Sequence, residues 1–143
     1  MKLSTRGRYG IHAMFDLACY GADGPQSIKS IAERQQIPEA YLEQLIAILR
    51  KSGLVISIRG AQGGYKLSRP PKDITVGEVL RSLEGKLAVT VSCLDEEGSC
   101  EKACICPSRL VWQKLHEGIN QIVDGITLQD MLSDHERLLA QEV

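Results

Sequence analysis

Four of the chain's five cysteines lie within a fourteen-residue segment, at Cys93, Cys100, Cys104 and Cys106. Their spacing, C-x6-C-x3-C-x-C, is neither that of a paired C-x2-C zinc knuckle nor that of a ferredoxin run. Four thiolates on one short segment can bind a soft metal centre, and the acidic side chains among them disfavour such clustering without a compensating cation. The segment therefore predicts an iron-sulfur cluster, of 2Fe-2S or 4Fe-4S type. Zinc, a thiol switch or no sensing role are the alternatives.

The composition places these cysteines in an ordinary globular protein. The chain has 143 residues, of which 43% are apolar and 24% are charged. No apolar run approaches the roughly 18 residues that span a bilayer, and the N-terminal residues lack the apolar core of a secretion signal. We therefore expect a cytoplasmic protein that does not engage a membrane. In a reducing cytosol, clustered cysteines are more often metal ligands or redox thiols than disulfides.

The sequence carries no pattern that predicts an enzyme. A C-x-x-C pair, a nucleophile paired with histidine and a phosphate-binding loop are all absent from it. These absences disfavour a thiol-redox enzyme. A protein-interaction adaptor that regulates by binding a metabolic enzyme stays open as an alternative.

Charge is divided unevenly between the two halves of the chain. Residues 1–72 hold eleven Lys and Arg against five Asp and Glu, whereas residues 73–143 hold six against thirteen. Basic charge concentrated in one half is the electrostatic footprint of a polyanion-binding module, because phosphate contacts supply most non-specific affinity. The first half is therefore a candidate nucleic-acid-binding region.

The beginning of this basic half has the pattern of an amphipathic helix. Residues 8–20 carry Ile11, Phe15, Ala18 and Cys19 at helical spacing, which predicts a first helix with that stripe facing the core. Cys19 lies far from the other cysteines, so we expect it to be buried as a small apolar residue.

Two further helices joined by a tight turn are predicted next. Ser27 can cap a helix from Ile28 to about Arg34, and Pro38 begins a helix that runs to about Ser52. The outward face of the second helix carries Ala40, Gln44, Ala47 and Lys51. Small residues let a helix approach base edges, and glutamine can bond bidentately to adenine in the major groove. An ordinary solvated face is the alternative for this helix taken alone.

A β-hairpin follows the second of these helices. Gly53 ends the helix, and residues 54–58 and 65–67 are predicted to form two strands across a glycine-rich turn. The turn carries Arg59 and Gly60, so its backbone can lie near phosphates while the guanidinium enters a narrow minor groove. A helix-turn-helix followed by such a wing favours DNA binding over a structural hairpin.

Three motifs closely resemble the IscR-type winged-helix transcription regulators, over nearly the whole chain. They are Leu3-Ser-Thr-Arg-Gly-Arg-Tyr-Gly, Tyr41-Leu-Glu-Gln-Leu and Leu54-Val-x-Ser-x-Arg-Gly-x-x-Gly-Gly-Tyr. The resemblance implies a homodimer that binds pseudo-palindromic double-stranded DNA operators, with the recognition helix in the major groove and the wing in the minor groove. Matching positions imply DNA contacts by Tyr41, Gln44 and Arg59, and a role in tuning site preference for Glu43.

The acidic half is predicted to supply a supporting helix and two C-terminal helices. Thr75-Val-Gly-Glu78 is a capping-box pattern that begins a helix running to about Leu83, after which residues 85–92 can be extended. Thr127 and Asp130 cap a final helix, which precedes a polar tail from Asp134.

Between these helices, Pro107 opens a long helix with an apolar stripe. The stripe consists of Val111, Leu115, Ile119, Ile122 and Ile126, at spacings of a helix-pairing seam. Packing within the chain is the alternative, but a chain this short has few elements able to cover so long a stripe. We therefore predict a dimerisation helix.

Together these patterns predict a mainly α-helical fold with a small β-hairpin wing, in which a winged helix-turn-helix joins a long dimerisation helix. One compact domain divides into a DNA-binding region (residues 1–72), a supporting helix with the cysteine segment (73–106), and the dimerisation and C-terminal helices (107–143). The expected function is that of a homodimeric transcription regulator, a repressor, that senses iron-sulfur, redox or related status.

The resemblance also bears on the ligands of the predicted cluster. Cluster-binding members of the family carry three cysteines in this segment and take a fourth ligand from elsewhere, in one branch a histidine three residues past the last cysteine. Alignment on Trp112 makes Cys106 the third family cysteine and puts Arg109, which cannot ligate a metal, at the position of that histidine.

We therefore expect the extra cysteine of this chain to supply the fourth ligand. The expected set is Cys93, Cys100, Cys106 and, as the fourth, Cys104. His116, about three helical turns beyond the last cysteine, is a weaker alternative. Another branch of the family binds no cluster and represses cysteine metabolism through a partner enzyme. That branch supplies the alternative function.

Overall fold

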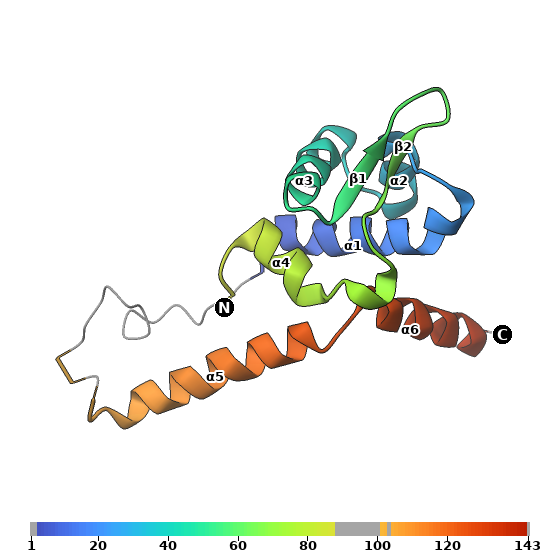
Figure 1. The fold of residues 1–143 in the computed structure, drawn as a ribbon. Coiled ribbons are helices and arrows are strands. Elements are labelled where there is room, and N and C mark those ends of the chain that lie inside the picture. Colours follow the sequence, from blue (N-terminus) through green and yellow to red (C-terminus); the bar gives the residue numbers. More distant parts are fainter. Residues whose placement is uncertain (1–2, 88–100, 103, 143) are drawn as a thin grey trace.

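The computed structural model describes residues 3–87, 101–102 and 104–142. Within these residues the chain forms six α-helices, two short 3-10 helices and one antiparallel hairpin (Figure 1). The main elements are α1 (Thr5–Tyr20), α2 (Ile28–Gln35), α3 (Glu39–Lys51), β1 (Val55–Ile58), β2 (Gly64–Leu67), α4 (Val76–Glu84), α5 (Pro107–Asp124) and α6 (Leu128–Gln141). This architecture confirms the predicted mainly α-helical fold with a small hairpin. Across the described ranges, no helix combines the length and apolarity that crossing a bilayer requires.

Helix α1 lies at the centre of the body and contacts α2, α3, α4, α6 and β2. Its fully buried apolar side chains are Ala13, Met14 and Leu17. The stripe predicted for this helix was misplaced, because its four residues, which include Ile11 and Cys19, are only partly buried. A helix covered by neighbours on several sides has no single apolar face for a periodic pattern to identify.

Helix α4 packs against α1 at two buried glycines. A Cβ atom on Gly10 would overlap the side chain of Leu83, and one on Gly7 would come within 2.7 Å of a Glu84 carboxylate oxygen. The two helices approach this closely because neither glycine carries a side chain.

The first turn of α1 and the last turn of α4 complete each other's hydrogen bonds. The Glu84 carboxylate accepts from the backbone N–H groups of Ser4 (3.2 Å) and Gly7 (2.8 Å), and from the Ser4 hydroxyl. In the other direction, the Arg6 guanidinium donates to the carbonyl oxygen of Leu83 (3.4 Å). The first N–H groups and the last carbonyls of a helix have no partner within it, so each helix supplies what the other lacks.

Helices α4 and α6 begin side by side. Both start with the capping boxes that the sequence predicts, Thr75 with Glu78 and Thr127 with Asp130. Thr75 and Thr127 pair as a short antiparallel bridge, held by backbone N–H···O bonds of 2.8 and 3.0 Å on either side. The bridge fixes the C-terminal helix to the supporting helix.

Helix α6 is longer than the sequence predicts, because it continues to Gln141 where a polar tail was expected from Asp134. The residues of this stretch favour helix, and Arg137 donates to Asp134 (2.9 Å) one turn earlier. Its apolar residues Leu138 and Leu139 are exposed like its polar ones. The polar composition therefore marked a solvated helix rather than the end of one.

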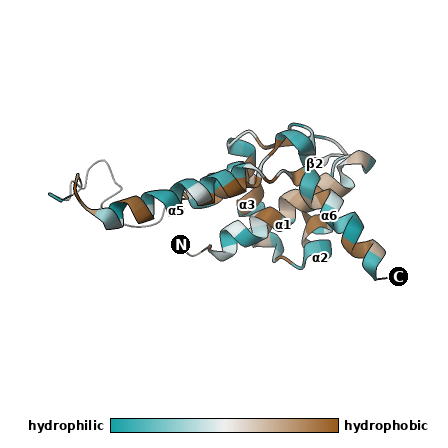
Figure 2. Cartoon of the chain, turned by 90° about the horizontal axis from the view of Figure 1, so that it is seen from below, coloured by the Kyte–Doolittle hydropathy of each residue, from teal (hydrophilic) through white to brown (hydrophobic). Residues whose placement is uncertain are grey.

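Helix α5 extends away from the rest of the described body, and its C-terminal part lies against α4 (Figure 1). None of the described residues of α5 is buried. Val111 is 52% exposed, Leu115 47% and Ile122 65%. Figure 2 shows apolar segments recurring along α5 where no other element covers them. The predicted stripe is therefore uncovered in a single chain, as a helix-pairing seam would be.

Candidate nucleic-acid interface and cysteine segment

Helix α3 presents an exposed face opposite the core. The buried face consists of Leu42, Leu45, Ile46 and Leu49. The residues predicted to read bases from this helix are exposed, apart from Tyr41: Ala40, Glu43, Gln44, Ala47 and Lys51. Burial of the apolar face fixes the helix, so the small and polar residues point to solvent as a set. The length of this face and its alanines suit insertion into a major groove.

Tyr41 lies differently, because its side chain is half-buried. Its ring centroid is 5.8 Å from that of Tyr9 on α1, with the ring planes at 75° in an edge-to-face arrangement. The ring also packs against the hydrophobic core. Tyr41 therefore fixes α3 against α1, and only part of its side chain faces solvent beside the other predicted contact residues.

The turn between α2 and α3 is short and rigid. Gln36 takes the left-handed conformation, with φ of 54°, and the next residue, Ile37, is buried. The Ile37 N–H donates to the carbonyl oxygen of Ala32 (3.1 Å), which closes the end of α2. The two helices thus form the helix-turn-helix that the sequence predicts.

The hairpin carries Arg59 and Gly60 on an exposed turn. The strands pair from Val55 with Leu67 to Ile58 with Gly64. Figure 1 shows the turn projecting past the strands on the side of α1 that also carries α3. A Cβ atom on Gly63 would overlap the carbonyl oxygen of Ile58, so the tight turn behind Arg59 requires glycine there. The predicted wing residues are accessible together.

Beneath this surface lies a polar cluster that the sequence analysis did not predict. Asp16 on α1 is fully buried and forms an ion pair with Arg34 of α2. The only sequence signal was an acidic residue inside an otherwise apolar helical pattern, because its partner lies eighteen positions further along the chain. The pair joins the central helix to the helix-turn-helix.

Two of the four clustered cysteines lie among the described residues. Cys106 is the N-cap residue of α5, and Cys104 is exposed two residues before it. Hydrogen bonds from the backbone N–H groups of Arg109 and Ser108, the first of these being the stronger effect, lower the pKa of the Cys106 thiol. A thiol at a helix N-terminus is held as thiolate in this way, and thiolate is the metal-binding form.

The other two predicted ligands, Cys93 and Cys100, lie outside the described residues, as does most of the stretch 85–92 that was predicted to be extended. Among the residues that the structure does describe, no three His, Cys, Asp or Glu side chains are grouped so that they could hold a metal ion. Cys19 is half-buried on α1, and burial is the main cause that raises the pKa of its thiol. That environment agrees with the packing role predicted for Cys19.

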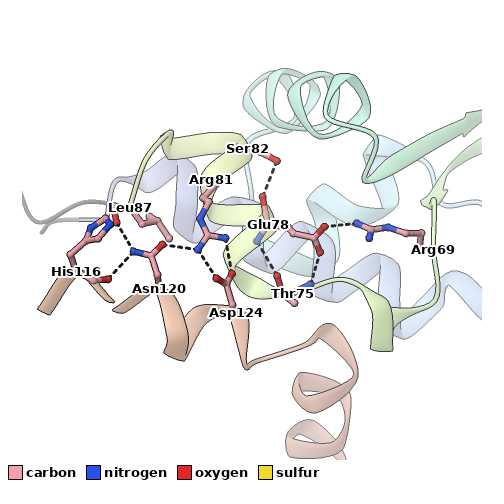
Figure 3. A network of polar contacts seen from close by, with 9 residues as sticks. All are labelled: Arg69, Thr75, Glu78, Arg81, Ser82, Leu87, His116, Asn120 and Asp124. Carbon is pink, nitrogen blue, oxygen red and sulfur yellow. Dashed lines mark hydrogen bonds and ion pairs between the residues drawn. The ribbon is translucent and has the colours of Figure 1, made fainter. Parts of the chain in front are cut away.

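The C-terminal part of α5 is joined to α4 by a polar network (Figure 3). Arg81 of α4 donates to both carboxylate oxygens of Asp124 (2.6 and 2.8 Å) and to the Asn120 side-chain oxygen (2.7 Å). The Asn120 amide in turn donates to the carbonyl oxygen of Leu87 (3.1 Å). A Cβ atom on Gly77 would overlap the Asp124 carboxylate, so α5 approaches α4 where α4 has no side chain.

The imidazole of His116 lies beside this network. Its Nδ1 atom is buried and has no hydrogen-bond partner among the described residues. Its carbonyl oxygen accepts from Asn120 (2.8 Å). Figure 3 places the His116 side chain next to Leu87, three residues beyond which the described part of this segment has already ended.

A helix-turn-helix with an exposed reading face, followed at once by a glycine-turned hairpin with an arginine on its turn, defines a winged helix-turn-helix DNA-binding protein. The family model Rrf2, described as an iron-dependent transcriptional regulator, matches residues 3–134. The chain belongs to the Rrf2 family.

Individual relatives agree with this assignment. The transcriptional regulator CymR of Bacillus subtilis is 42% identical, over 93% of this chain and 91% of its own length. The transcriptional regulator IscR of Aliivibrio salmonicida is 40% identical, over 95% of this chain and 80% of its own. The solved structure of T. potens IscR matches with a TM-score of 0.78 and 50% identity, over 96% of this chain and 90% of that one.

The comparisons confirm the IscR-type resemblance and the winged-helix fold. The chain is thus a DNA-binding transcription regulator, and its matched relatives are regulators rather than enzymes.

Proposed function

We propose that two copies of the chain bind a double-stranded DNA operator in the cytoplasm and repress transcription according to the state of an iron-sulfur cluster held by the cysteine segment. The observation that carries the DNA-binding part is the exposed face of α3 beside an exposed wing turn. Gln44 and Glu43 lie centrally on that face, where a major groove presents base edges. Ala40 and Ala47 permit close approach, and Lys51 adds phosphate affinity.

Arg59 contributes most from the wing. Its side chain is exposed, and the glycine-rich turn allows the backbone at Gly60, with φ of 110°, to come close to a phosphate. A guanidinium on such a turn fits a narrow minor groove, where the negative potential is enhanced. Tyr41 lies at the edge of α3, where its partly exposed side chain can contact the DNA backbone while its ring holds the helix against Tyr9.

Arg59→Ala should weaken operator binding by about 1–3 kcal/mol and reduce the dependence of affinity on salt by about one phosphate equivalent. Fluorescence anisotropy on a duplex selected by the protein from a random-sequence pool measures both. Arg137→Ala is the matched control, because Arg137 is an exposed arginine on α6. Equal affinities for the two variants would remove the wing from DNA recognition.

The uncovered stripe of α5 supports the homodimer. A second copy of the same helix presents the same apolar residues, so the two helices can cover each other in a symmetric pair. Two reading heads on one dimer match the two half-sites of a palindromic operator.

The described cysteines fit the proposed metal site in their chemistry. Cys106 is held toward thiolate by the start of α5, and Cys104 is accessible beside it. Thiolates are the ligands that iron-sulfur clusters prefer, and a cluster would supply sensitivity to oxidants and to iron supply. Cys93 and Cys100 complete the proposed ligand set. His116 remains the alternative fourth ligand, supported by its unpaired Nδ1 atom.

Cys106→Ser should lower the iron and sulfide bound after anaerobic reconstitution, together with the visible absorbance, because the loss of one thiolate leaves an incomplete ligand set. Cys19→Ser is the control, since Cys19 lies on α1 among packed residues and should bind as much iron as the wild type. Cys104→Ser tests the fourth ligand in the same assay. Bound zinc without colour would instead support a zinc site, and no bound metal in the wild type would remove the metal from the proposal.

The state of the cysteine segment can reach the DNA-reading face through described contacts. Cys106 begins α5, the Arg81 network joins α5 to α4, and α4 packs against α1 and α3. A change in how the segment holds the start of α5 would therefore alter the spacing of the two reading heads in a dimer. Such coupling requires that the two cluster states differ in their affinity for the DNA-competent form.

A cluster-free regulator that acts through a partner enzyme is the second candidate, supported by the identity with CymR of Bacillus subtilis. Four clustered cysteines favour the metal site over this alternative. Operator affinity measured with and without bound iron separates the two candidates, because a cluster-free regulator would show no difference.

A further inference from the structure

The buried ion pair beneath the reading surface has a third member on the wing side. Asp16 accepts from Arg34 through Nε (2.9 Å) and Nη2 (2.7 Å), and from the Gln35 amide (3.0 Å). The same Nη2 atom of Arg34 donates to the side-chain oxygen of Gln26 (2.9 Å). The guanidinium carbon also lies 4.1 Å from the ring centroid of Tyr20, which stacks over it. Arg34 is therefore held in one orientation from several directions.

Gln26 is held in place on its other side as well. Its side-chain amide donates to the carbonyl oxygens of Tyr20 (3.1 Å) and Gly24 (3.0 Å). All the hydrogen-bonding directions of this side chain that point inward are thus used. The residue lies in the link between α1 and α2, where a short connection would otherwise be free to shift.

The backbone of Gln26 bonds to the wing. Gln26 and Tyr65 pair as an antiparallel bridge, with N–H···O bonds of 2.8 Å in both directions. The neighbouring Gly64 has φ of 153°, and a Cβ atom there would come within 2.6 Å of the Gln26 carbonyl oxygen. The second strand of the hairpin can therefore approach the α1–α2 link only because it carries glycine at this point.

We propose that Gln26 is a positioning residue for DNA reading, because it joins the buried Asp16–Arg34 pair to Tyr65 at the base of the wing. Through this link the wing turn with Arg59 is held at a fixed position relative to α2 and α3. The inference rests on the proposed contact between the wing and DNA. A wing anchored only through its own two strands could pivot about their ends, since a lone two-stranded hairpin is weakly held.

The chemistry separates this role from a structural one. The Asp16–Arg34 pair keeps its bidentate contact and the bond from Gln35 when the Gln26 side chain is removed. Gln26 is only partly buried. Replacing it therefore leaves the buried charges compensated, so the main loss is in the position of the wing rather than in the fold.

The test is a double-mutant cycle with Gln26→Ala, Arg59→Ala and the double variant, measured as operator affinity at one salt concentration. Gln26→Ala alone should weaken binding severalfold, and Arg59→Ala alone about tenfold. In the Arg59→Ala background, Gln26→Ala should cost less than twofold, because the contact that it positions is already absent. Gln129→Ala, an exposed glutamine on α6, is the matched control and should leave affinity unchanged.

Multiplying effects in the double variant would contradict the proposal, because Gln26 would then act independently of the wing. Amide hydrogen exchange, measured without DNA, gives a second and separate readout. Gln26→Ala should speed exchange at the Tyr65 amide severalfold while amides at the centre of α1 keep their protection. Unchanged exchange at Tyr65 would overturn the positioning role even where affinity falls. If Arg59→Ala itself leaves affinity unchanged, the proposed wing contact fails, and the exchange result alone decides whether Gln26 anchors the wing.

Discussion

Ile122→Asp is expected to convert the dimer to a monomer. Ile122 is the most exposed of the apolar residues on the α5 stripe, at 65%, and pairing of two α5 helices would bury it against its symmetry mate. An unpaired carboxylate placed in such a seam costs about 3–5 kcal/mol, so the dimer dissociation constant should rise by about two to three orders of magnitude. Operator affinity should fall with it, because each reading head then binds its half-site alone.

Sedimentation velocity over a range of concentrations measures the dissociation constant directly. Gln113→Asp is the matched control, because it places the same charge on α5 at an exposed polar position on the opposite side of the helix. The control should remain dimeric. An Ile122→Asp protein that also stays dimeric would show that the seam lies elsewhere and that the stripe has another partner.

Arg34→Met should destabilise the fold by about 3–5 kcal/mol, because it leaves the fully buried Asp16 without a compensating charge. A loss of that size is a large fraction of the stability of a small domain, so the variant may be recoverable only at low temperature or with DNA bound. Urea unfolding followed by circular dichroism measures the change in the free energy of unfolding.

The comparison with Arg137→Met makes the expectation specific. Arg137 and Asp134 form an ion pair at 2.9 Å as well, but their side chains are 67% and 61% exposed. Exposed pairs contribute about 0–1 kcal/mol, so this variant should unfold almost as the wild type does. Similar losses in both variants would mean that burial does not decide the energetics of the Asp16 pair.

The helix-turn-helix and the wing could be predicted from the sequence because their signals are local. Apolar spacing, Pro38, Gly53 and the glycines of the hairpin turn each act within a few residues of their own position. The two capping boxes were found for the same reason, since the threonine and its acidic partner are three residues apart. These elements carry most of the candidate reading face.

The contacts that hold the reading face in place could not be predicted in this way. Asp16 and Arg34 are eighteen positions apart, and Ser4 and Glu84 are eighty apart, so no periodic pattern connects them. Tyr41 was expected at the DNA, and nothing in its local sequence indicates that its ring also packs on Tyr9. The length of α6 was misjudged because helix propensity, rather than burial, extends it.

The mutual bonding of α1 and α4 makes the reading half responsive to acid. Hydrogen bonds from Ser4, together with the charge of Arg6 and the Gly7 amide, lower the pKa of Glu84 below its ordinary value. A carboxylate with a lowered pKa in the folded state contributes stability above its unfolded pKa and loses it as the pH falls through the folded value. Protonation of Glu84 would therefore release the first turn of α1 and the last turn of α4 together, at the point where the chain leaves α4 toward its cysteines. Asp124, whose pKa is lowered by Arg81, weakens over the same acidic range. Acidity would thus loosen α4 from α1 at one end and from α5 at the other through two carboxylates that share no contact.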